Sequence, residues 1–189
     1  KNNVYIDLAL VYKRDLQDTA KALEFITLGR TRYPEVNSLI REEANIYLQT
    51  GRVNEAIEKL EIAISKTPEE SNLHLVLASQ YDNLAAEAFR NNKMNDQAKY
   101  FAKAEASYKK AVELKPDLFD SHYNFGAMYF NLGAEMANKA NDLKSDAEYN
   151  AAKAKADEKL KQALPHLEKA RSLSPSDRNT LNSLKQIYI

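Results

Sequence analysis

The sequence predicts an all-α fold in which helical hairpins stack in a row. Only 4 of the 189 residues are glycine and 5 are proline, so the chain has few turns and long regular elements. Ala, Leu, Glu and Lys dominate the composition and favour helices. Four similar segments each end in a proline, at Pro34, Pro68, Pro116 and Pro175. A small residue precedes a tyrosine by three positions near the start of each segment: Ala9/Tyr12, Ala44/Tyr47, Ala78/Tyr81 and Gly126/Tyr129.

Residues 37–70 form the segment with the most regular spacing. We expect Gly51 to end its first helix, because glycine adopts the left-handed conformation at a helix C-terminus without steric cost. Asn54 is then the expected N-cap of the second helix, and Pro68 stops that helix. The alanines of this segment predict places where helices cross closely: Ala44, Ala56 and Ala63.

This pattern resembles the tetratricopeptide repeat (TPR), a helix–turn–helix of 34 residues with an A-x3-F pair and a terminal proline. The resemblance covers nearly the whole chain and implies a right-handed TPR α-solenoid over residues 1–189, a single domain. It places repeats at 2–36, 37–70, 71–118 and 119–177, and a terminal helix at 178–189. The tryptophan of the family is missing, and its place is taken by Tyr5, Ile40, His74, His122 and Leu181.

The third and fourth repeats are longer than 34 residues, by 14 and 25 residues. Both insertions fall between the two helices and lack the Gly, Pro and Ser density of loops. We therefore expect two elongated helical hairpins, with turns at 90–96 and 141–146 and Ser145 as an N-cap. Pro165 is expected to kink the last long helix. One hypothesis is that these hairpins only enlarge the core; the other is that they form a platform for a partner.

Several functional classes find no support in the composition. Lys+Arg and Asp+Glu both number 27, which argues against a nucleic-acid binder. No apolar run approaches the ~20 residues that cross a bilayer, so no membrane insertion is expected. The chain has no cysteine, and its three histidines lack metal-binding spacing. We therefore expect no enzyme activity, no metal and no cofactor.

In the TPR family the first helices of successive repeats line a concave groove that receives a peptide. The resemblance therefore implies a non-catalytic scaffold that binds an unknown protein or peptide in this groove. By register, further positions that face the groove are Asn3, Ile6, Leu10, Lys13, Ser38, Leu48, Asn72, Asp82, Asp120, Ala127, Asn182 and Gln186. The favoured contacts are Arg41, Asn45, Gln49, Leu75, Ser79, Asn83, Tyr123, Asn124, Phe130 and Asn131. Asparagine recurs among them, and its amide can both donate to and accept from a peptide backbone.

Some TPR proteins hold the C-terminal carboxylate of a chaperone through conserved lysine, arginine and asparagine side chains. Arg41 and Asn45 could imitate the first pair of that clamp. The remaining clamp positions fall at Val76, Asp120 and Asn124, and Asp120 would repel a carboxylate. The sequence therefore argues against binding of such tails.

The alternative function is self-assembly, in which a homodimer forms through the elongated hairpins of the third and fourth repeats. The compartment stays open, because the chain begins at Lys1 and not at Met. It resembles bacterial TPR proteins, many of them exported. A cytoplasmic protein is one expectation, and a periplasmic or cell-envelope protein that has lost an N-terminal signal peptide is the other.

Overall fold

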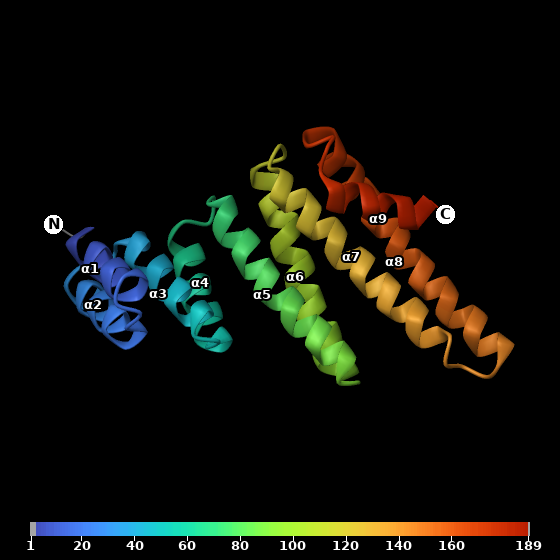
Figure 1. The fold of residues 1–189 in the computed structure, drawn as a ribbon, viewed down its shortest axis with the longest axis horizontal. Coiled ribbons are helices and arrows are strands. Elements are labelled where there is room, and N and C mark those ends of the chain that lie inside the picture. Colours follow the sequence, from blue (N-terminus) through green and yellow to red (C-terminus); the bar gives the residue numbers. More distant parts are fainter. Residues whose placement is uncertain (1–2, 189) are drawn as a thin grey trace. The chain divides into compact units, whose positions relative to one another are not determined.

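The computed structural model describes residues 3–188, and these residues form nine α-helices joined by short turns (Figure 1). The predicted fold class, an α-solenoid of helical hairpins with two elongated hairpins, is confirmed. Residues 2 and 189, which bound the expected first repeat and terminal helix, lie outside the described residues. The chain divides between Gln80 and Tyr81 into two compact units, which are described separately.

The N-terminal unit contains four complete helices and the first half of a fifth. These are α1 (Asn3–Arg14), α2 (Thr19–Arg32), α3 (Asn37–Gln49), α4 (Val53–Lys66) and the beginning of α5 (Ser71–Arg90). Its core is a cluster of small and branched side chains from α1, α2 and α3: Ala9, Ala22, Ile26, Leu39 and Ile46. Tyr12 closes this core by stacking on Phe25, with ring centroids 5.2 Å apart.

The turn between α3 and α4 shows one correct and one wrong prediction. Gly51 ends α3 with φ of +72°, the left-handed conformation expected of it. Asn54 is not the N-cap, because α4 already begins at Val53 and Arg52 precedes it without a side-chain cap. The Arg52 N–H donates to the Tyr47 carbonyl at 2.8 Å. This hydrogen bond closes the turn directly after Gly51. The helix therefore starts at Val53, and Asn54 lies inside its first turn and not before it.

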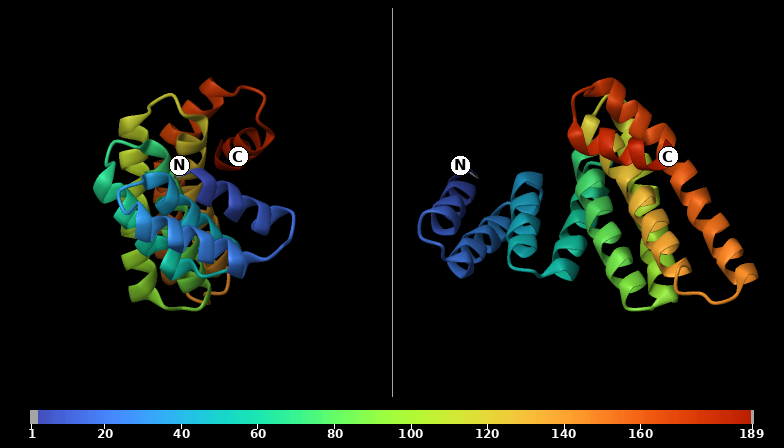
Figure 2. Two further views of the ribbon diagram at one scale, coloured as in Figure 1. Left: turned by 90° about the vertical axis from the view of Figure 1, so that its left-hand side faces the viewer. Right: turned by 45° about the vertical axis from the view of Figure 1, so that its right-hand side comes forward.

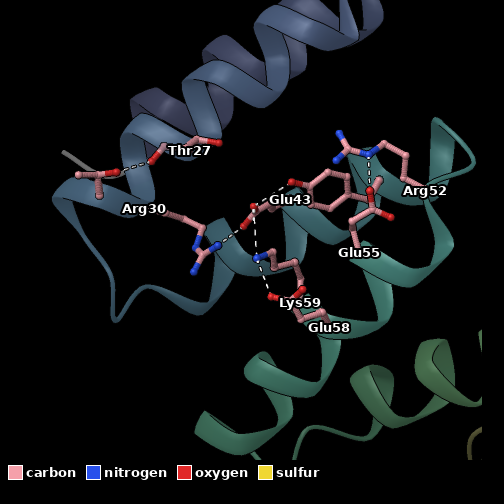
Figure 3. A network of polar contacts seen from close by, with 9 residues as sticks. Thr27, Arg30, Glu43, Arg52, Glu55, Glu58 and Lys59 are labelled. Carbon is pink, nitrogen blue, oxygen red and sulfur yellow. Dashed lines mark hydrogen bonds and ion pairs between the residues drawn. The ribbon is translucent and has the colours of Figure 1, made fainter.

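A buried carboxylate joins three helices of the N-terminal unit (Figure 3). The Glu43 side chain of α3 forms ion pairs with Arg30 of α2 and, at 4.0 Å, with Lys59 of α4. Glu43 is only 4% exposed, so its charge depends on these two cations. The Arg52 guanidinium lies 4.5 Å from the ring centroid of Tyr47, the tyrosine one turn after Glu43 on α3.

The C-terminal unit contains the rest of α5 and four further helices: α6 (Met94–Leu114), α7 (Phe119–Ala140), α8 (Asp146–Leu173) and α9 (Arg178–Tyr188). The α5–α6 and α7–α8 turns fall where the sequence predicts them, and both lie at the same end of the helices (Figure 2). Ser145 caps α8 by accepting a hydrogen bond from the Glu148 N–H at 3.5 Å. The Lys139 ammonium donates to the Phe89 carbonyl and to Asn92 Oδ1, both at 2.9 Å, and so ties the two hairpin tips together.

Small residues bring α7 and α8 close together. A Cβ added at Gly126 would lie 2.7 Å from Leu167 Cγ, and one at Gly133 would lie 3.0 Å from the Ala156 carbonyl oxygen. Ala156 and Ala163 of α8 are fully buried. α8 continues through Pro165 from Asp146 to Leu173.

The four tyrosines of the repeat pattern all avoid solvent. Tyr81 and Tyr129 are 4% and 5% exposed, whereas Tyr12 and Tyr47 are half-buried. Tyr129 donates its hydroxyl proton to Glu105 of α6 at 2.5 Å, so that the ring packs while its oxygen keeps a partner. Within the part of the chain that the structure describes, no helix combines the length and apolarity required to span a membrane.

Candidate functional site

Two grooves are hollowed into the helical units, one in each. The first groove lies in the N-terminal unit, between α1, α3, α4 and the start of α5, and has a volume of about 380 Å³. Its floor is apolar and consists of Ile6, Leu60, Leu73 and Val76. Its walls are polar and consist of Ser38, Arg41, Glu42, Asn45, Glu70 and Asn72.

The charged side chains of the first groove are paired with each other or with a neighbour. Arg41 forms an ion pair with Glu70, and Lys13 forms one with Glu42 at 2.5 Å. The Asn45 amide lies 3.3 Å from Glu42. Because its carboxylates already have cations, the first groove offers a ligand mainly amides, a hydroxyl and an apolar floor.

The second groove lies in the C-terminal unit between α5, α6 and α7, and has a volume of about 530 Å³. Its apolar lining includes Ala85, Phe101, Met128 and Leu132. Four amides surround this lining: Asn83, Gln97, Asn131 and Asn138. Its ionisable side chains are Asp82, Glu87, Arg90 and Glu135, three carboxylates against one guanidinium.

The charges of the second groove are not balanced. Arg90 reaches Glu135 at 3.7 Å. Burial raises the pKa of the Asp82 carboxyl to about 6, and the Glu135 carboxylate acts on this pKa in the same direction. In the described part of the chain no cation forms an ion pair with Asp82 or Glu87.

The residues that the sequence favours for binding fall into three groups. Arg41 and Asn45 meet in the first groove, and Asn83 and Asn131 meet in the second groove. Gln49 is exposed at the end of α3, whereas Leu75 and Ser79 are half-buried on α5. The remaining three are half-buried on α7 and line neither groove: Tyr123, Asn124 and Phe130. The Tyr123 ring stacks on Phe119, with centroids 5.7 Å apart.

The ionisable residues of the second groove that the sequence analysis missed are Glu87, Arg90 and Glu135. They lie in the inserted segments, to which the 34-residue register assigns no position. The sequence does contain a signal for two of these residues. Glu87 follows Asn83 by four residues, and Glu135 follows Asn131 by four residues. Residues four apart share a helix face, so extending the groove face by one turn would have found them.

The histidines take packing positions, including His74 and His122, which stand in the place of the family's tryptophan. His74 Nε2 lies 2.7 Å from the Pro68 carbonyl oxygen, and His122 Nε2 lies 2.9 Å from that of Pro116. Each ring thus ties the start of a helix to the preceding loop. His166 packs on Phe125 with centroids 4.0 Å apart, and burial lowers its pKa to about 4. Across residues 3–188 no group of three or more His, Asp or Glu side chains could hold a metal ion.

Residues 100–133, from the middle of α6 into α7, match the sequence pattern of the TPR repeat. These residues contain a tetratricopeptide repeat. The matched window runs from the second helix of one TPR hairpin into the first helix of the next, so it contains the α6–α7 connection at Pro116. A comparison with curated protein sequences finds no match.

Solved TPR structures share the fold. The crystal structure of MamA protein superposes with a TM-score of 0.67 at 19% identity, over 99% of this chain and 80% of that chain. A thermophilic TPR protein of Thermus thermophilus gives a TM-score of 0.57 at 20% identity, over the full length of both chains. The first TPR of Spaghetti (RPAP3), bound to the HSP90 peptide SRMEEVD, gives 0.54 at 22% identity, over 80% of this chain and 90% of that chain.

Proposed function

We propose that this TPR protein is a non-catalytic scaffold whose grooves, one in each unit, bind peptide segments of partner proteins. The first groove supports this proposal best, because it combines an apolar floor with exposed amides on its walls. Asn45 and Asn72 line this groove and are exposed, whereas Leu60 and Leu73, which also line it, are buried. Apolar surface supplies affinity for side chains, and amides can hold an extended backbone.

The RPAP3 structure is of a related fold with the HSP90 peptide SRMEEVD bound. Binding of that kind of acidic tail is not part of the proposal for this chain. Val76, an apolar residue, lines the first groove where the clamp needs an amide. The second groove is acidic and would repel a carboxylate.

The experiment selects ligands for the whole chain from a library of random peptides displayed on phage. Affinities of the selected peptides are then measured by fluorescence polarisation for the wild type and for the double variant Asn45→Ala, Asn72→Ala. We expect the double variant to bind at least about tenfold more weakly, because the backbone of the peptide loses its amide partners.

The matched control is Asn95→Ala, Asn150→Ala, which removes two exposed helical asparagines outside both grooves. This control should bind as the wild type does. The proposal fails if no peptide is selected, or if the groove variant and the control variant bind the selected peptides equally well.

A second candidate function, self-association, is favoured by an apolar hollow at the hairpin tips. It has a volume of about 410 Å³ and includes Phe89, Met136, Ala140 and Leu143. Leu143 in the α7–α8 turn is 41% exposed. An exposed apolar surface at the end of two joined hairpins suits a second copy of the chain.

Light scattering on a size-exclusion column tests this candidate with the variant Leu143→Glu. If the hairpin tips form a dimer interface, the wild type has the mass of a dimer and the variant has the mass of a monomer. A wild type that remains monomeric at high concentration contradicts self-association and leaves peptide binding unaffected.

A further inference from the structure

The second groove differs from the first in the state of its carboxylates. In the first groove both wall carboxylates, Glu42 and Glu70, have a cation beside them. In the second groove Arg90 lies 3.7 Å from Glu135, while Asp82 has no cationic partner among the described residues. The two units therefore present different electrostatic surfaces to a ligand, although both are built from TPR helices.

The position of Asp82 explains why its charge is costly. Asp82 lies half-buried on α5 at the groove, and the Glu135 carboxylate of α7 acts on it there. The other ionisable lining residues are Glu87 and Arg90 on the same helix, and α6 contributes only Gln97 and Phe101. The groove thus holds two carboxylates with restricted access to water and a single guanidinium, which pairs with one of them. This arrangement favours the binding of an added positive charge.

We infer that the second groove binds a lysine or arginine side chain of the partner segment, with Asp82 and Glu135 as its counter-charges. This inference rests on the proposed function and names the chemistry that one of its two grooves selects. The amides of Asn83 and Asn131 stand beside the carboxylates and can hold the peptide backbone next to the cation. The apolar lining of Phe101 and Met128 suits the methylene stem of such a side chain.

Other cationic ligands fit the groove less well. Among the described residues no cluster of three carboxylates or histidines has metal-binding geometry, which argues against a metal ion. A volume of about 530 Å³ exceeds that of an ion and is open to a side chain together with part of its backbone. An acidic or phosphorylated segment would meet three carboxylates and be repelled.

The test is a double-mutant cycle between Asp82 and the cation of a selected peptide. The probes are peptides from the phage selection, synthesised once with their lysine or arginine and once with citrulline or norleucine at that position. Fluorescence polarisation gives their affinities for the wild-type chain and for Asp82→Asn. Glu158→Gln is the matched control, because Glu158 is an exposed carboxylate of α8 outside both grooves.

We expect the selected peptides to share a lysine or arginine, and Asp82→Asn to weaken their binding by about tenfold or more. The neutral peptides should bind the wild type and Asp82→Asn equally well, and Glu158→Gln should change nothing. A salt titration should reduce the affinity of the cationic peptides alone.

Two results overturn the inference, and they are distinguishable. If some selected peptides respond to Asn45→Ala, Asn72→Ala but none responds to Asp82→Asn, the proposed function stays in place and cation selection is refuted. A selection that returns no peptide refutes both. Asp82→Asn keeps the side-chain volume, and its folding is checked separately by urea denaturation, so that loss of binding cannot be mistaken for loss of structure.

Discussion

Asp82 is a residue whose buried carboxyl carries a cost to the stability of the fold. Its carboxyl has a pKa of about 6 against an ordinary value of 3.8, because burial and Glu135 both disfavour the charge. Between these two pH values the folded chain retains a proton that the unfolded chain has lost. Stability therefore falls as the pH rises from about 4 to about 6, and the loss persists at neutral pH.

Replacing Asp82 with asparagine should stabilise the free protein at neutral pH. Each pKa unit corresponds to about 1.4 kcal/mol, so the free energy of unfolding should rise by up to about 3 kcal/mol. Urea denaturation of the wild type and of Asp82→Asn, near pH 7 and near pH 4, measures this difference. The gain should disappear near pH 4. A variant that is less stable than the wild type near pH 7 would contradict the assigned environment of Asp82, in which burial and the Glu135 carboxylate disfavour the charge.

His166 imposes the opposite pH dependence. Burial lowers its pKa from 6.5 to about 4, and nearby His122 acts in the same direction. As the pH falls through this range the unfolded chain takes up a proton before the folded chain does, so stability falls toward acid. In the background of Asp82→Asn, where the competing carboxyl is gone, the free energy of unfolding should fall by about 1–2 kcal/mol between pH 6.5 and pH 4, because His166 is only half-buried and solvent screens part of the effect.

His166→Leu keeps an apolar side chain against Phe125 and removes the titration. Thermal denaturation across this pH range should then show a flatter profile for the leucine variant. Some slope should remain, because burial also lowers the pKa of His122. Parallel profiles for the two proteins would mean that His166 is solvated in the folded chain.

The seam between α7 and α8 depends on glycine. Gly126→Ala gains up to about 1 kcal/mol of helix propensity. The new Cβ, however, would lie 2.7 Å from Leu167 Cγ and 3.1 Å from the Leu167 backbone nitrogen. Because a backbone atom cannot move aside as a side chain can, we expect a net loss of about 1–2 kcal/mol. Urea denaturation measures the loss.

Gly51→Asn provides a contrast to Gly126→Ala. Gly51 has φ of +72° and open space around it, and asparagine tolerates the left-handed conformation better than other residues. We expect this variant to lose only a few tenths of a kcal/mol. If Gly51→Asn lowered the free energy of unfolding more than Gly126→Ala does, close packing would not explain why glycine is needed between α7 and α8.

The helices were predictable where the sequence carries local signals. Turns at Gly51, 91–93 and 141–145, and the Ser145 cap, follow from residues with strong conformational preferences. The prediction of Asn54 as an N-cap was wrong because a backbone hydrogen bond from the Arg52 N–H closes the turn early. The pattern of side chains does not encode this backbone geometry. The repeat lengths revealed two insertions. These were predictable as helical hairpins because neither insertion has the density of helix-breaking residues that a loop would show.

The lining of the two grooves was less predictable than the helices. Arg41, Asn45, Asn83 and Asn131 line grooves because they occupy fixed positions on the first helices of TPR hairpins. The inserted segments have no counterpart in a 34-residue repeat, so Glu87 and Glu135 were not assigned to the groove. The effect of Glu135 on Asp82 arises from spatial proximity between α5 and α7, and a one-dimensional pattern does not contain that proximity.

The whole molecule carries two unlike grooves, one in each unit. Its formal net charge is zero, yet the second groove is acidic and the first is internally paired. If the inferred cation selection holds, the first groove would favour neutral side chains and the second groove a cationic one. Such a pattern would let the scaffold distinguish partners by charge placement, with little dependence on total charge.

The most direct test of this account maps where a selected peptide binds, by NMR chemical-shift changes of the backbone amides in the whole chain. We predict that the changes concentrate around Asn45 on α3 and the start of α5 for a peptide in the first groove, and around Asp82 and Asn131 on α5 and α7 for a peptide in the second groove. Changes confined to α2, α4 and α8, with α5 and α7 unaffected, would contradict binding in the grooves.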